Sequence, residues 1–80
     1  MGKFDYLTHY LKYEAGDDAI LTFSDIERII GEPLCPSAYK YAAYWRLTDR
    51  HMLPRAIDAA GYRVERVHLH DQTVVLRKNG

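Results

Sequence analysis

The spacing of apolar residues changes along this chain, and the change limits the folds available to it. Over most of the chain before Gly61, apolar residues recur at three- and four-residue intervals, as on one face of an α-helix. After it they alternate with polar residues, which is typical of half-buried strands. The alternating residues are Val64, Val67, Leu69, Val74 and Leu76. The pattern predicts an α+β domain, in which a small helical block precedes a C-terminal β-hairpin.

Two helices and a short strand are predicted for the first half of the chain. Helical spacing indicates a helix over residues 4–13, and a short apolar run indicates a strand over residues 19–23. The Ser24 hydroxyl is placed to cap a second helix, with Glu27 reaching back to the cap residue. Gly31 supplies the left-handed residue that ends this helix.

Two more helices are predicted before the hairpin. Ser37 is placed to cap a helix over residues 38–47. Its core-facing stripe consists of Ala38, Tyr41, Ala42 and Trp45. A turn follows at residues 48–50, and a fourth helix covers residues 52–60. In the hairpin, the apolar residues slip in phase at residues 65–66, which indicates a β-bulge, and a turn is expected at residues 70–72.

This order of elements is the order expected of a winged helix-turn-helix-like domain with one additional helix before the hairpin. In that fold a helix enters the major groove of DNA while the hairpin contacts the backbone. Eighty residues are enough for one domain, residues 1–80, with one core. Small α+β domains also serve as protein-interaction modules, because a fold does not determine a function.

Charge and cysteine content narrow the classes of function. Eleven basic and eleven acidic residues give no net charge, which argues against tight non-specific binding to nucleic acid. Residues 1–35 carry a net charge of −4 and residues 36–80 a net charge of +4. The single cysteine, Cys35, allows no internal disulfide and fits a cytoplasmic location, and no apolar run is long enough to predict a membrane partner.

A basic and aromatic stretch in the second half is the candidate binding surface. Arg and Lys side chains neutralise phosphates, and Tyr can stack on bases or form hydrogen bonds. We expect the helix over residues 38–47 to present these side chains on the face opposite Trp45. The candidate nucleic-acid-binding or partner-binding residues are Lys40, Tyr44, Arg46, Arg50, His51, Arg55, Arg63, Arg66 and Arg77. The alternative interpretation of the same residues is a solvated face.

The sequence carries no motif of a known catalytic site, so we predict neither an enzyme nor a cofactor. His68 and His70 alternate on one strand beside Asp71, but a zinc site needs about four ligands. Cys35 or His51 would have to come from distant segments. We therefore interpret the two histidines as exposed strand and turn residues, predict no metal, and treat Cys35 as an ordinary thiol.

A set of residues between positions 22 and 77 follows the pattern of a known family. They are Thr22, Phe23, Ile26, Glu27, Ile29, Ile30, Gly31, Leu34, Ser37, Ala38, Trp45, His51, Ala56, Ala60, Gly61, Tyr62, Val64, Val75 and Arg77. At this spacing they resemble an uncharacterised family of small bacterial and phage proteins with no established activity. Where members usually carry Pro, Trp, Asn and a second Trp, this chain has Cys35, Tyr44, Leu47 and Ile57. The resemblance implies that a surface built from those family residues is changed here.

Two functions are open at this point. In the first, the protein is a nucleic-acid-binding regulator whose third or fourth helix enters a groove while Arg63, Arg66 and Arg77 contact phosphates. In the second, it is a protein-binding module, for example a phage-encoded inhibitor of a host defence (CRISPR-type) complex or a small accessory subunit. Tyr39, Tyr44 and the tyrosines of the first helix would then be the anchors. A homodimer is compatible with either function.

Overall fold

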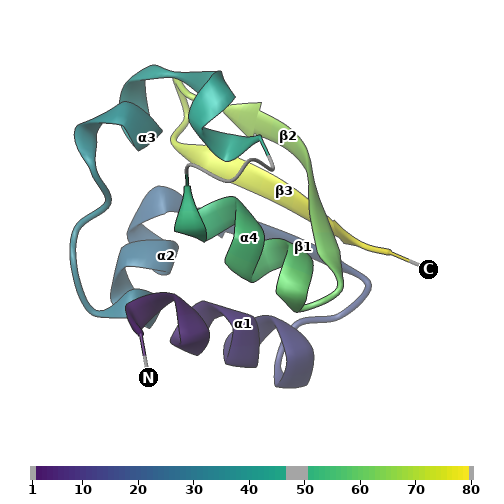
Figure 1. Ribbon diagram of the computed structural model, residues 1–80. Coiled ribbons are helices and arrows are strands. Elements are labelled where there is room, and N and C mark those ends of the chain that lie inside the picture. Colours follow the sequence, from purple (N-terminus) through teal and green to yellow (C-terminus); the bar gives the residue numbers. More distant parts are fainter. Residues whose placement is uncertain (1, 47–50, 80) are drawn as a thin grey trace.

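A computed structural model describes residues 2–46 and 51–79, and Figure 1 shows it as a ribbon. The elements are α1 (Lys3–Tyr13), β1 (Asp18–Thr22), α2 (Phe23–Ile30), α3 (Pro36–Lys40), the 3₁₀ helix η1 (Ala42–Trp45), α4 (Met52–Ala59), β2 (Tyr62–His68) and β3 (Thr73–Lys78). The helices gather on one side of a three-stranded antiparallel sheet (Figure 1). The predicted α+β class and the C-terminal hairpin are confirmed.

The sheet has the order β1-β3-β2, so the strand from the first half of the chain joins the hairpin. β1 pairs with β3, which places Asp18 opposite Arg77. β2 pairs with the other side of β3, and the register shifts between Val64 and Arg66, which confirms the predicted bulge. Alternate residues of β1 and β3 are buried under the helices, while Ile20 lies on the uncovered face.

Trp45 is at the centre of the core. Its side chain is 2% exposed, its ring stacks on Phe23 at a centroid distance of 5.0 Å, and its Nε1–H donates to the carbonyl oxygen of Ala38 at 3.0 Å. Burying a large aromatic side chain with its single donor satisfied is strongly favourable. The prediction that Trp45 faces the core is confirmed.

The residue that caps the start of α2 is not the predicted one. The cap is Thr22, whose hydroxyl accepts from the Asp25 N–H, while the Asp25 carboxylate accepts from the Thr22 N–H, each at 3.0 Å. The backbone hydrogen bond from Thr22 lowers the pKa of Asp25. Ser24 lies inside the helix, so its predicted capping role is wrong. Gly31 ends the helix with a φ of 82°, as predicted.

The prediction that Glu27 completes a capping box is wrong, because its carboxylate accepts two other hydrogen bonds. Its carboxylate accepts from the Leu34 backbone N–H at 2.8 Å and from the Tyr39 hydroxyl at 2.7 Å. These bonds tie the segment after α2, and α3 itself, to the body of the domain. Burial and the hydrogen bond to Glu27 raise the pKa of Tyr39 to about 12.

The single helix predicted over residues 38–47 is two short helices. α3 begins with Pro36 in its first position, after Cys35 in the cap position, so Ser37 lies within the helix and its predicted capping role is also wrong. Tyr41 then leaves helical geometry, with φ −128° and ψ 120°, and η1 follows. Leu47 and the turn predicted at residues 48–50 lie outside the described residues.

The break at Tyr41 separates Tyr41 from Trp45. Residues four apart lie on the same face of a continuous α-helix, so a helix with Trp45 in the core would also turn Tyr41 inward. In the structure Trp45 and Tyr44 are buried, with Tyr44 only 7% exposed, whereas Tyr41 is 61% exposed. The predicted positions of these two tyrosines, Tyr41 inward and Tyr44 outward, are therefore wrong.

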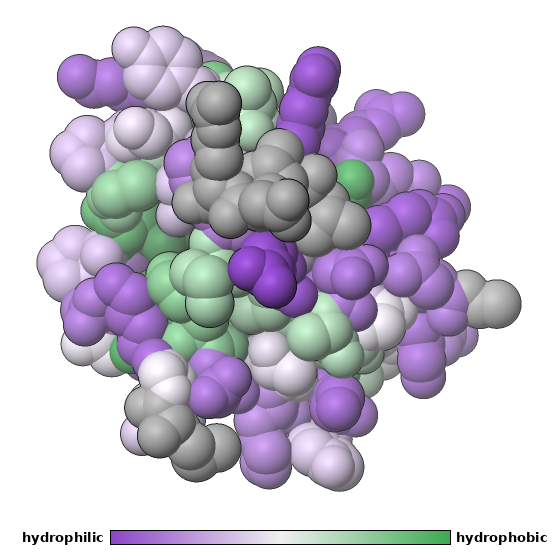
Figure 2. Space-filling model, viewed as in Figure 1, coloured by the Kyte–Doolittle hydropathy of each residue, from purple (hydrophilic) through white to green (hydrophobic). Residues whose placement is uncertain are grey.

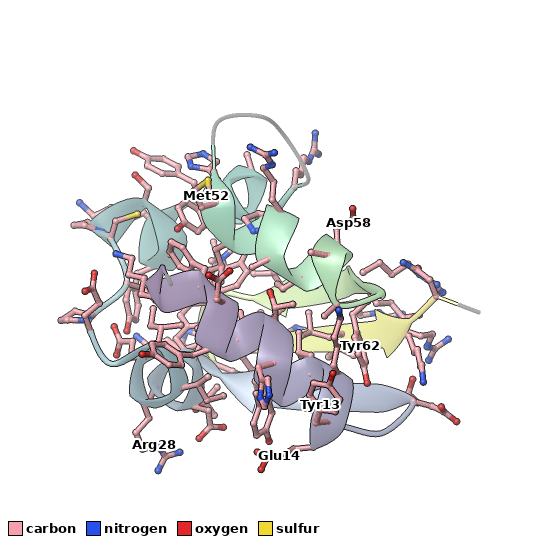
Figure 3. The ribbon with its side chains drawn as sticks, turned by 60° about the horizontal axis from the view of Figure 1, so that its bottom comes forward. Tyr13, Glu14, Arg28, Met52, Asp58 and Tyr62 are labelled. Carbon is pink, nitrogen blue, oxygen red and sulfur yellow. The ribbon has the colours of Figure 1, made fainter. Side chains whose placement is uncertain are left out.

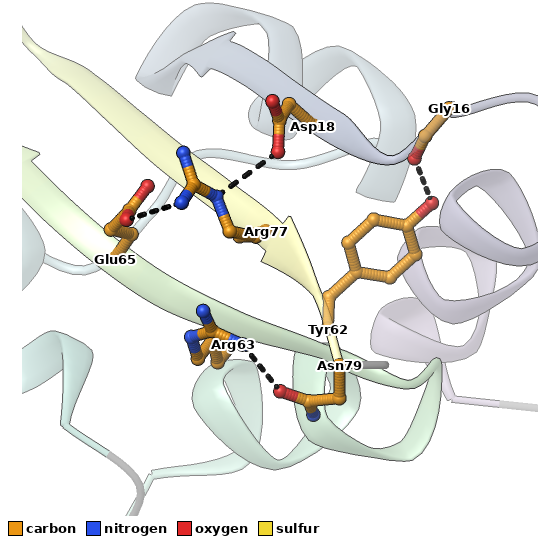
Figure 4. Close-up of polar contacts among 7 residues, drawn as sticks. All are labelled: Gly16, Asp18, Tyr62, Arg63, Glu65, Arg77 and Asn79. Carbon is orange, nitrogen blue, oxygen red and sulfur yellow. Dashed lines mark hydrogen bonds and ion pairs between the residues drawn. The ribbon is translucent and has the colours of Figure 1, made fainter.

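α4 and the hairpin follow the prediction closely. Pro54 lies in the first turn of α4, where no backbone N–H is needed. The Tyr62 hydroxyl at the start of β2 donates to the Gly16 carbonyl oxygen and so fastens the link between α1 and β1 (Figure 4). Within the described residues, no helix has the length and apolar character needed to cross a bilayer.

Candidate binding groove

An open groove lies between η1, α4 and β2, and its volume is about 410 Å³. Its apolar lining comes from Ala42, Trp45, Pro54, Ile57, Tyr62, Val64 and Val67. Its charged lining comes from Arg46, Arg63 and Arg66, with Asp58 and Glu65. We call it the arginine groove. It brings together basic residues from two segments that are separated by α4 in the sequence.

The position of β2 in the sheet explains why the groove is open. β2 is an edge strand with only β3 as a neighbour, so its other side is not covered by a strand. The bulge between Val64 and Arg66 interrupts the alternation, and both Glu65 and Arg66 are exposed. The bulge therefore adds charged side chains to an edge whose inward residues are apolar.

Polar contacts along the sheet decide which charges remain available in the groove (Figure 4). The Arg77 guanidinium donates to Glu65 at 3.1 Å and to Asp18 at 3.2 Å. Glu65 is thus paired with a residue outside the groove, which shares its one positive charge between Glu65 and Asp18. Arg63 donates to the Asn79 side-chain oxygen at 3.2 Å, a neutral partner that leaves its positive charge uncompensated.

No ion pair found among residues 2–46 and 51–79 involves Arg46, Arg55 or Arg66. All three side chains are exposed. Asp58 is the one carboxylate of the groove lining that no described ion pair engages. The groove therefore combines an apolar wall with an excess of positive charge, which suits a ligand that is partly apolar and partly anionic.

The nine predicted site residues are brought together only in part. Arg46, Arg63 and Arg66 line the groove. Arg55 is exposed on α4, and Lys40 is exposed at the end of α3. These five residues are exposed, as a binding role requires.

The other four predicted residues have different surroundings. Tyr44 is buried, against Trp45 at a ring distance of 5.7 Å and against His51 at 4.5 Å. Burial, together with a hydrogen bond to the Cys35 thiol, raises the pKa of Tyr44. Arg77 is held between two carboxylates, as described above. Arg50 lies outside the described residues.

Sequence reasoning missed the apolar wall of the groove. Pro54 and Ile57 were expected only as helix residues, and Val64 and Val67 only as the inward side of a strand. β2 lacks a second neighbour, and its inward residues Val64 and Val67 are half-buried. The strand alternation indicated that they face inward but not that they border a groove. Asp58 had no signal that distinguished it from any exposed helix residue.

The surface around these elements differs in polarity (Figure 2). Hydrophilic side chains gather on the right of the view, where β2 begins and β3 ends, and hydrophobic ones show between α2, α3 and α4. His68 and His70 are exposed, as expected. Within residues 2–46 and 51–79, no group of three or more His, Cys, Asp or Glu side chains is placed to hold a metal ion.

Fold and groove together define the class of this protein: a small α+β domain whose three-stranded antiparallel sheet borders an open, arginine-lined groove. The chain belongs to the DUF7662 family, a domain of unknown function that matches residues 4–79. The resemblance to an uncharacterised family is thereby confirmed. No curated protein and no solved structure shows a significant match to the chain.

Proposed function

We propose that this protein is a non-catalytic module that binds nucleic acid through the arginine groove. The observation that carries the proposal is the convergence of Arg46, Arg63 and Arg66 on one groove with an apolar wall. Guanidinium groups neutralise phosphates and stack on bases, and apolar side chains accept the flat faces of bases and sugars. The expectation of a cytoplasmic location belongs to the same proposal.

The order of elements supports a winged helix-turn-helix-like mode of binding. Strand β1 precedes α2, the hairpin closes the chain, and the sheet order is β1-β3-β2. α4 is the helix before the hairpin, the position of the helix that enters the major groove in that fold. It presents Met52, Arg55 and Asp58 to solvent. Arg55 would then read or position the duplex beside the arginine groove.

Local charge, rather than total charge, is the basis of the proposed affinity. The chain has no net charge, so binding depends on the few arginines that keep an uncompensated charge. If Arg46, Arg55, Arg63 and Arg66 each contact one phosphate, log Kobs should fall with log salt with a slope of about −3 to −4. A shallower slope would mean that fewer of them touch the backbone.

The test is a fluorescence-anisotropy titration with labelled duplex DNA, single-stranded DNA and RNA at low and at physiological salt. The proposal predicts micromolar or tighter binding to at least one of them, weakening with salt at the slope given above. Absence of binding to all three at low salt would overturn it.

A second candidate, a protein-binding module, is favoured by one specific observation. The arginine groove follows the open edge of β2, and its apolar wall includes Val64 and Val67. An extended peptide can pair with such an edge while its side chains enter the groove. An inhibitor or accessory subunit of a larger complex would use the groove in this way. Amide exchange of β2 that slows on adding a partner protein, without nucleic acid, would favour this candidate.

A further inference from the structure

The two sides of the arginine groove come from opposite faces of β2. Val64 and Val67 pair with residues of β3 that are 0% exposed, so both valines face the helices. Arg63 and Arg66 lie next to them in the strand and point to the other face, where Arg63 pairs with the exposed Arg77. The groove therefore has an apolar wall on its inner side and a basic rim on its outer side.

The basic rim and the apolar wall differ in how far a ligand must enter to reach them. The three groove arginines are exposed, whereas Val64 and Val67 are half-buried and Ile57 is 1% exposed. A ligand therefore contacts both sides only if it inserts an apolar part and keeps an anionic part near the surface. Its two parts must also be close together, because the rim and the wall alternate along one strand.

An unpaired nucleotide has this arrangement and a duplex does not. In a duplex the base faces are stacked inside, so a protein reaches only phosphates, sugars and base edges. A nucleotide outside a duplex has a free base face, which apolar and aromatic side chains can cover, next to its phosphate. The groove volume of about 410 Å³ lies in the range of about 300–1,000 Å³ that holds one small ligand, so it suits one nucleotide.

Asp58 gives the groove a direction. It lies on the α4 side and projects outward from that helix (Figure 3), and no ion pair among the described residues engages it. A carboxylate repels a phosphate but accepts hydrogen bonds from the N–H groups of a base. The base edge is therefore favoured beside α4 and the phosphate beside β2, where Arg63 and Arg66 lie.

We propose that the arginine groove holds one unpaired nucleotide, with its base against the apolar wall and its phosphate against the basic rim. This inference rests on the proposed function and narrows it to nucleic acid that contains a single-stranded segment. An N–H group of the base donates to the Asp58 carboxylate. Arg46, the third exposed base of the groove, contacts the phosphate of the next nucleotide. A single-stranded segment can extend a duplex, so the inference is compatible with the contact proposed for Arg55.

Fluorescence-anisotropy titrations of the full chain at low salt test the proposal with three matched probes, each made in DNA and in RNA. The probes are a blunt duplex, the same duplex with a three-nucleotide single-stranded extension, and that extended duplex with abasic residues in the extension. The last probe keeps the phosphates and removes the bases. We expect the extended duplex to bind at least about tenfold more tightly than either of the other two probes.

Two acid substitutions test the direction of the groove. Asp58→Ala removes the acceptor for the base and should weaken binding of the extended duplex by at least about fivefold. The same variant should bind the abasic probe more tightly than the wild-type protein does, because a negative charge near the phosphates is lost. Asp71→Ala removes an exposed carboxylate outside the groove lining and should leave the ratio of these two affinities unchanged. Circular dichroism establishes that both variants are folded.

Two results would overturn the proposal while leaving nucleic-acid binding itself intact. One is equal affinity for the blunt and the extended duplex, and the other is equal affinity for the extended duplex with and without its bases. An Asp58→Ala variant that binds the extended duplex more tightly would overturn the direction assigned to the nucleotide. Absence of binding to all probes would overturn the proposed function itself, so the two failures are distinguishable.

Discussion

The arginine groove and the outer face of α1, which we call the α1 face, use their apolar residues in opposite ways. The apolar wall of the groove is part of the core: Trp45 is 2% exposed and Ile57 is 1% exposed. On the α1 face the rings of Tyr6 and Tyr13 lie outside the core, and Tyr13 is 72% exposed. The shape of the groove is therefore maintained by the folding energy, whereas these two exposed rings add little to folding.

The two regions also differ in how the fold distributes charge. The first half of the chain is acidic and the second half basic, but pairing β1 with β3 brings Asp18 to Arg77 and compensates part of both excesses. Arg28 of α2 is paired with Asp25. Positive charge without a described ion pair is concentrated instead at η1, α4 and β2. Four predictions test this contrast.

The largest expected effect is that of Trp45→Ala. Removing a buried aromatic side chain that stacks on Phe23 should lower the free energy of unfolding by about 3–5 kcal/mol. Tyr13→Ala removes an aromatic side chain from the α1 face and should change it by less than about 0.5 kcal/mol, measured on the monomer. Urea denaturation of both variants at low protein concentration makes the comparison. Equal losses of unfolding free energy in the two variants would contradict the distinction between the buried wall of the groove and the exposed rings of the α1 face.

The next effect concerns the hydroxyl of Tyr39, which links α3 to Glu27 of α2. Tyr39→Phe should cost about 1 kcal/mol at neutral pH, because the carboxylate loses one of its two donors. The folded-state pKa of Tyr39 is raised from 10.0 to about 12. The stabilisation is therefore complete below pH 10 and is lost as the pH rises to about 12.

Unfolding free energies measured by urea denaturation from pH 7 to pH 11 check this sign. The wild-type protein should lose stability above pH 10 more steeply than Tyr39→Phe does. Tyr41→Phe is the control, because Tyr41 is exposed and should reproduce the wild-type slope. If the unfolding free energy falls equally steeply with pH in wild type and in Tyr39→Phe, ionisation of Tyr39 does not weaken its hydrogen bond to Glu27.

The last prediction on stability separates the two possible caps of α2. Thr22→Ala removes the side chain that accepts from the Asp25 N–H and should cost about 1 kcal/mol. Ser24→Ala changes a residue inside the helix and should cost less than about 0.5 kcal/mol. Thermal denaturation of the two variants measures the difference. A larger loss in Ser24→Ala would restore the cap inferred from sequence.

Local patterns were sufficient for the parts of the fold that depend on neighbouring residues. The alternation after Gly61 and its phase slip located the hairpin and its bulge, because strand faces follow a period of two. The division of residues 36–45 into two short helices could not be predicted in this way. Helical spacing there is compatible with one continuous helix. The break at Tyr41, which leaves Tyr41 exposed while Trp45 is buried, depends on tertiary packing.

The candidate site shows the same limit. Residue type alone correctly marked Arg46, Arg63 and Arg66 as accessible bases, but it could not separate them from Arg77. That residue is compensated by Asp18, which is 59 positions away and reaches it only through the pairing of β1 with β3. The addition of β1 to the sheet had no local signal, because strand pairing across such a distance depends on the whole fold.

The measurement that tests the central claim most directly is charge reversal in the arginine groove. Arg66→Glu and Lys12→Glu make the same change in net charge, the first in the groove and the second on the exposed surface of α1. In anisotropy titrations at low salt, Arg66→Glu should weaken nucleic-acid binding at least about tenfold and make the salt slope shallower by at least about one. Lys12→Glu should bind as the wild-type protein does. Equal affinities for the two variants would contradict binding through the groove.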